Sequence, residues 1–211
     1  MNRYFIENSN TTLRKILNKE ENLDIVQNII EAFLHMKIKK IILRPYLKEK
    51  NKNLPKEGKY GIVNVRVITE EDIQFNIGIQ IMDGLYLQEK LLTYGMSIHL
   101  NQSQYEDYNE VEKTITINFL DFIGFKTRGY HKKITFLEGK DDDNIKIEGE
   151  IILHSIELPN YHKEEIETQE DEWIIYLKGE KHDLIDKIKA KNQYIKKLDD
   201  ILIDYWKKET L

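Results

Sequence analysis

One stretch, residues 58–80, restricts the fold of this chain more than any other, because it has the pattern of a β-hairpin. β-Branched and aromatic residues cluster at 60–68, and apolar residues alternate with polar ones at 73–80. The polar segment 69–72 between the two runs is typical of a turn. We therefore expect two antiparallel strands within a larger sheet.

Three positions of this hairpin interrupt its apolar pattern. Asn64 breaks the first run. Gly78 and Gln80 lie on the face of the second strand opposite Ile77 and Ile79, because successive side chains of a strand alternate between faces. These three positions are therefore the first candidates for a functional site.

The spacing of these positions resembles the core of the PD-(D/E)XK nucleases, and among them the Rpn-type recombination-promoting nucleases and transposases. That family's core reads Lys-x-x-x-x-Asp-Val, then a short hairpin, then Asn-Ile-Glu-Met-Gln. This chain has Lys59-Tyr-Gly-Ile-Val-Asn64-Val65 and Asn76-Ile-Gly78-Ile-Gln80 in the same frame. Asn64 thus stands where the family has Asp, Gly78 where it has Glu, and Gln80 where many nucleases of this fold have Lys.

Further segments resemble the family in the same order, from about residue 12 to about residue 178. They include Lys90-Leu-Leu-Thr-Tyr94, with Lys90 in place of the family's Arg, and the run Trp173-Ile-Ile-Tyr-Leu177. The resemblance implies an α/β (α+β) fold. Its core is restriction-endonuclease-like, with a central mixed β-sheet, flanking helices and a C-terminal helix.

The resemblance also implies the chemistry of the site. In the family the Asp and the Glu hold Mg²⁺, which stabilises charge on the phosphate and generates the attacking hydroxide. Mg²⁺ binds weakly without carboxylate ligands. Asn64 keeps an oxygen without charge, and Gly78 keeps no ligand at all. We therefore expect no cofactor. Mg²⁺ matters only if Asp83 or Glu89 serves as a relocated ligand beside Gln80, and both are otherwise surface acids.

Composition restricts the function further. The chain has 211 residues, a net charge of −5 and no cysteine, which excludes disulfides, thiolate zinc sites and cysteine nucleophiles. An acidic chain lacks the global positive field typical of nucleic-acid-binding proteins, so we expect a protein partner ahead of nucleic acid.

There is no signal peptide and no apolar run of ~18 residues, which predicts a cytoplasmic protein without membrane contact. The bias towards Lys, Ile and Asn is typical of AT-rich bacterial or phage genomes.

One local basic cluster stands out near the predicted strand at 37–43. Its members there are Lys37, Lys39, Lys40 and Arg44. Such a cluster fits either a phosphate-backbone or partner contact, or a solvated strand face.

The six histidines show no metal-ligand spacing. Among them, His131 and His154 fit either phosphate binding or ordinary packing.

The rest of the chain predicts helices that alternate with strands. Helices are expected at 23–35 and 85–100, and strands at 37–43, 114–122, 133–137 and 146–158. One further helix is expected at 183–208, with a 4–3 apolar spacing interrupted at Lys191. We expect a nuclease-like domain at 1–178 and a helical extension at 179–211, which docks on the domain or serves as a dimer or partner contact.

Three functions remain open at this point. The first is a catalytically inactive nuclease-fold protein that binds a partner, in defence, counter-defence or a mobile element. The second is a metal-dependent DNA endonuclease or transposase with relocated ligands, and the third is a structural homodimerisation module. The chain keeps the residue spacing of the family core but lacks both acidic ligands, which favours the first function. Under it, Asn64→Asp with Gly78→Glu is expected to restore a response to metal.

Overall fold

The computed structural model describes residues 9–44, 63–82, 86–100, 102, 111–135 and 151–209. Its strands are β1 (Ile38–Leu43), β2 (Val63–Thr69), β3 (Gln74–Met82), β4 (Lys113–Leu120), β5 (His131–Thr135) and β6 (Ile151–Glu157). They form one six-stranded sheet in the order β1-β2-β3-β4-β6-β5. β3, β4 and β6 run parallel, whereas β1 pairs antiparallel with β2, β2 with β3, and β5 with β6.

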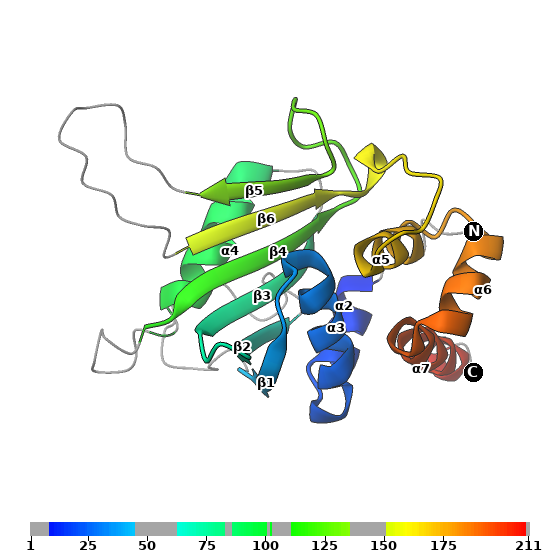
Figure 1. The fold of residues 1–211 in the computed structure, drawn as a ribbon, viewed down its shortest axis with the longest axis horizontal. Helices are drawn as coiled ribbons and strands as arrows, with labels where there is room; N and C mark the ends of the chain where they lie inside the picture. Colours follow the sequence, from blue (N-terminus) through cyan, green and yellow to red (C-terminus); the bar gives the residue numbers. More distant parts are fainter. Residues whose placement is uncertain are drawn as a thin grey trace.

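Helices cover both faces of this sheet. They are α2 (Ser9–Leu17), α3 (Leu23–Leu34), α4 (Leu87–Leu100), α5 (Gln169–Lys178), α6 (His182–Lys191) and α7 (Gln193–Glu209), with short 3₁₀ turns at Glu20–Asn22 and Leu158–Asn160. Figure 1 shows α4 on one face of the sheet and α2 and α3 on the other, and α5 and α7 pack on α3. A mixed sheet with flanking helices confirms the predicted fold class.

The hairpin forms where the sequence predicts it. β2 and β3 pair antiparallel, although residues 60–62 of the predicted first run lie outside the described residues. In the turn, the backbone N–H of Asp72 donates to the carbonyl of Thr69 over 3.0 Å. Asp72 has φ of 60°, in the left-handed region that Asp enters more readily than most residues. β5 begins at His131 rather than at residue 133 as predicted.

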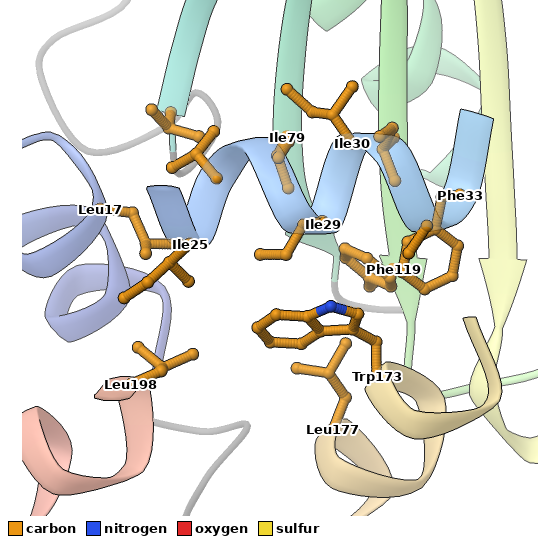
Figure 2. Packing of buried hydrophobic residues seen from close by; sticks show 14 of the residues in the cluster. Leu17, Ile25, Ile29, Ile30, Phe33, Ile79, Phe119, Trp173, Leu177 and Leu198 are labelled. Atoms are coloured by element: carbon orange, nitrogen blue, oxygen red, sulfur yellow. The ribbon is translucent and has the colours of Figure 1, made fainter. Parts of the chain in front are cut away.

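The main apolar core lies between the sheet and α3. Helical spacing directs Ile29, Ile30 and Phe33 of α3 to this core, where Phe33 packs edge-on against Phe119 of β4 with ring centres 4.9 Å apart (Figure 2). On the outer side of α3, Trp173 of α5 is buried and its indole N–H donates to Asn28 over 2.9 Å. α3 therefore joins the sheet to the C-terminal helices.

The prediction of one continuous helix at 183–208 is wrong, because the helix breaks at Asn192. Asn192 has an extended backbone, and its side-chain oxygen accepts from the N–H groups of Tyr194 and Ile195, at 3.0 and 3.1 Å. The Asn192 amide also donates to Glu172 of α5 over 2.8 Å. A short polar side chain that satisfies the first N–H groups of a helix favours a new helix start over continuation.

We predict that Asn192→Ala lowers the free energy of unfolding by roughly 1–2 kcal/mol, because it removes the cap of α7 and the bond to α5 together. Urea denaturation of the two proteins measures this difference. Gln193→Ala, at the exposed neighbouring residue, is the matched control and should leave stability nearly unchanged. Equal stability of the Asn192 and Gln193 variants would contradict the capping role.

Candidate functional site

The two faces of the sheet differ in polarity. The face towards α3 carries apolar residues such as Ile77, Ile79 and Ile117. On the face towards α4, the central strands carry a buried set of polar side chains: Asn64, Asn76, Gln80, Thr114, Thr116, Asn118 and Ser155. Burying polar groups is unfavourable unless they are hydrogen-bonded. The polar face under α4 is therefore the first place to look for a site.

Strand register brings the three predicted site positions together on this face. Asn64 of β2 lies opposite Gly78 of β3. In the parallel pair next to it, Gly78 is in register with Thr116 of β4, and Gln80 with Asn118. Paired residues point to the same side of a sheet, so all five positions meet beneath α4.

Asn118 is the residue that organises this group, and sequence reasoning missed it. Its side-chain oxygen accepts from the Gln80 amide over 2.5 Å, and its amide donates to Thr116 over 2.8 Å and to the carbonyl of His154 over 2.7 Å. The period-2 pattern Thr114-Ile-Thr-Ile-Asn118 was a signal for it, because it places polar residues on one face of β4. Gln80 is therefore held by β4.

The space in front of Gly78 is filled by α4. Tyr94 is buried, and its hydroxyl donates to the carbonyl of Ile79 over 3.3 Å. A Cβ atom at position 78 would lie 2.6 Å from the Tyr94 hydroxyl oxygen and 2.8 Å from Cδ1 of Ile98. Both distances are shorter than real Cβ contacts, so any side chain at 78 requires Tyr94 and Ile98 to shift.

The residues at this position do not fit Mg²⁺. Asn64 is buried and its side-chain oxygen has no hydrogen-bond partner, so one neutral oxygen faces the site. Gly78 adds no oxygen, and Gln80, whose amide nitrogen donates to Asn118, offers only a neutral oxygen. Mg²⁺ requires carboxylate ligands and nearly octahedral geometry. Within the described residues, no three His, Asp or Glu side chains are grouped so that they could hold a metal ion.

The structure describes two of the other predicted catalytic or ligand residues, and both lie on α4. Glu89 is exposed on α4, away from the helix face that carries Leu91 and Tyr94. Lys90 is partly buried beside that face. Lys59 and Asp83 lie outside the described residues. Among the predicted positions that the structure describes, Asn64, Gly78 and Gln80 thus form the group, and Glu89 does not join it.

The predicted basic cluster is partly neutralised. On the edge strand β1, Lys39 forms an ion pair with Asp72 over 2.6 Å. Arg44 lies 3.5 Å from the buried carboxylate of Glu112. Lys37 and Lys40 are exposed. Half of the cluster is therefore used in ion pairs within the fold.

A second polar group, on the opposite face of the sheet, joins residues far apart in the sequence. Nδ1 of His131 lies 2.9 Å from the buried carboxylate of Glu170, and Nε2 of His131 lies 2.8 Å from Nδ1 of His154. His35 approaches the other Glu170 oxygen at 3.6 Å. Burial lowers the pKa of His154 to about 4, helped by the neighbouring His131 and Lys133. His154 is therefore neutral near pH 7 and lies against the ring of His131.

This lowered pKa predicts acid sensitivity. A histidine whose pKa falls from 6.5 unfolded to about 4 folded binds fewer protons in the folded state, so stability is full above pH 6.5 and falls below it. The free energy of unfolding should drop by roughly 1–2 kcal/mol between about pH 7 and pH 5.

Urea denaturation across this range measures the effect. His154→Gln should flatten the pH dependence, because Gln does not titrate. The matched control His162→Gln, at an exposed histidine, should leave it unchanged. An equally steep dependence in His154→Gln would assign the effect to other groups.

The contact at Gly78 predicts a coupling between β3 and α4. Gly78→Ala should lower the free energy of unfolding by about 1–3 kcal/mol through overpacking. In a Tyr94→Phe/Ile98→Val background, which removes the two closest atoms, the same substitution should cost less. A double-mutant cycle in urea measures the coupling. Strict additivity would mean that Gly78 and α4 do not interact.

Comparison with known protein families identifies the family of the chain. A family described as PD-(D/E)XK nuclease family transposase matches residues 11–209. No curated protein and no solved structure matches the chain. The family match extends over the sheet, α4 and the C-terminal helices. In the described residues, no helix has the length and apolar character that crossing a membrane requires.

Proposed function

The chain belongs to the PD-(D/E)XK nuclease family transposases, and we propose that it is a member that no longer cleaves DNA and acts by binding a partner. The contact between Gly78 and Tyr94 carries this proposal. The family's second carboxylate would have to project from position 78, and that space is occupied by Tyr94 and Ile98.

Two separate changes support the loss of cleavage. Replacement of the acidic residues by Asn64 and Gly78 removes two negative charges, and with them the electrostatic hold on Mg²⁺. A nearby carboxylate can compensate for such a loss when room remains for a metal and its waters. Here α4 packs directly on β3, so the second change also removes the room.

Binding is the function that this arrangement leaves in place. The closed site is part of a well-packed sheet, so the proposal leaves function to the outer surfaces of the fold. The family description names transposases, which supports a partner connected with a mobile element, or with defence or counter-defence against one. An active nuclease relative is one such partner.

We expect the purified protein to leave plasmid DNA intact with either Mg²⁺ or Mn²⁺. Agarose-gel electrophoresis of supercoiled plasmid checks this. A Tyr94→Phe variant prepared in the same way should also leave the plasmid intact. Robust cleavage that co-purifies with the protein would defeat the proposal. If Asp83→Ala or Glu89→Ala then abolished the cleavage, the relocated-ligand endonuclease would be the correct function.

Restoring the site should require space as well as charge. The sequence led us to expect that Asn64→Asp with Gly78→Glu is sufficient for a response to metal. The contact with Tyr94 changes this expectation, because Glu at 78 meets the Tyr94 side chain. Adding Tyr94→Ala makes room, so only the triple variant should be stabilised by Mg²⁺ in thermal unfolding. Leu91→Ala in place of Tyr94→Ala controls for a cavity elsewhere under α4. A metal response of the two-ligand variant alone would show that Tyr94 moves aside easily.

A further inference from the structure

Two histidines on neighbouring strands are joined by a hydrogen bond at the edge of the sheet. Nε2 of His131 on β5 lies 2.8 Å from Nδ1 of His154 on β6, and the two ring centres are 5.1 Å apart. Nδ1 of the same His131 lies 2.9 Å from the buried carboxylate of Glu170 on α5. The three side chains therefore form one hydrogen-bonded chain from the edge of the sheet to a helix.

Hydrogen-bond chemistry fixes the positions of the protons in this chain at neutral pH. A carboxylate only accepts, so Nδ1 of His131 donates to Glu170. A neutral imidazole has one N–H group, so Nε2 of a neutral His131 accepts, and Nδ1 of His154 donates to it. One added proton leaves the bond between the rings intact, because a charged ring can donate to a neutral one. A second added proton breaks it, because both nitrogens of the contact then carry hydrogen.

The surroundings of the two rings oppose the second proton. Glu170 is shared by His131 and by His35 at the end of α3, at 2.9 and 3.6 Å. Lys133 of β5 is the register partner of His154 and adds a further positive charge beside it. Burial, with these neighbours, lowers the pKa of His154 to about 4. The other titratable or charged groups near the chain are Tyr130, Lys163 and Asp171, together with the ion pair of Lys132 and Glu157.

β5 is the element that a broken contact affects. It is an edge strand of five residues that pairs with β6, and none of its residues is fully buried. On the opposite face of β5, Lys132 donates to the buried Glu157 over 2.7 Å. Segments with little buried surface open at a lower free energy than the whole fold. The contact between the two histidines therefore acts on a strand that can open locally.

We propose that the contact between His131 and His154 is an acid-sensitive latch, which holds β5 on β6 and opens when both rings are charged. The opening uncovers the edge of β6, and a bare strand edge can pair with another chain. The latch does not depend on the loss of cleavage, because its residues lie on the face of the sheet opposite the polar site under α4.

Native-state hydrogen exchange followed by NMR between about pH 7 and pH 5, corrected for intrinsic exchange rates, tests the latch. The open segment binds one proton more than the closed one between the ordinary pKa of 6.5 and the closed-state pKa of about 4. The closed form is therefore favoured above pH 6.5 and loses ground below it. Protection of the amides in the β5–β6 pairing should fall about 20-fold over this range.

Low concentrations of urea separate a local opening from global unfolding. Exchange in the β5–β6 pairing should hardly respond to urea, because a local opening exposes little surface. The best-protected amides of β2 and β3 should exchange through larger openings that urea promotes. The latch is overturned if β5 and β3 show the same protection and the same urea dependence at pH 5, since acid would then act on the whole fold.

His154→Gln is the decisive variant, because an amide side chain both donates and accepts and does not titrate. It should keep β5 protected and remove the pH dependence there. The matched control His162→Gln, at an exposed histidine, should exchange like the unmodified protein. An unchanged pH dependence in His154→Gln would refute the latch.

Nitrogen NMR of the histidine rings in the unmodified protein gives a second readout that needs no variant. Both His131 and His154 should carry their proton on Nδ1 at pH 7. A proton on Nε2 of His154 instead would contradict the proposed chain.

Discussion

The close approach of α4 to β3 at Gly78 is the contact on which the character of this protein depends. Because position 78 has no side chain, the Tyr94 hydroxyl reaches the backbone of β3 and donates to the carbonyl of Ile79. That packing closes the polar face of the sheet over Asn64 and Gln80, both of which are nearly inaccessible to solvent. One missing side chain thus accounts for the close approach of α4 to β3, which buries the polar residues beneath the helix.

Much of the fold was predictable from short-range patterns. A β-rich run located β2, and period-2 alternation located β3 and placed Gly78 and Gln80 on one of its faces. The pairing of β2 with β3 then sets Asn64 opposite Gly78. The pairing of strands that lie far apart in the chain was harder to predict from the sequence. The role of Asn118 depends on the parallel register of β3 with β4, which the sequence pattern alone does not set. Tyr94 was visible as a residue of a predicted helix, but its contact with Gly78 depends on how that helix docks.

Other features depend on contacts that no spacing rule describes. His131, His154 and Glu170 come from three different elements, so their hydrogen-bonded chain has no signature in the sequence. The break at Asn192 arises because one side chain caps α7 and bonds to α5, whereas the apolar pattern on both sides favoured a single helix. The same limit applies to charge, since Glu112 and Asp72 neutralise cations that are distant from them in sequence.

The replacement of acidic residues at this site also affects the stability of the metal-free fold. Two carboxylates in one site repel each other unless a metal is bound, so a nuclease site of this kind lowers the stability of the metal-free protein. Asn64 and Gly78 remove that repulsion, but they leave polar surface with no partner. Packing Tyr94 and Ile98 against Gly78 replaces the empty space with van der Waals contacts. Once this packing exists, a returning carboxylate at 78 has to displace a buried side chain before it can bind anything. Under the proposed loss of cleavage, closure that follows the loss of the ligands is therefore harder to reverse than the loss of the ligands alone.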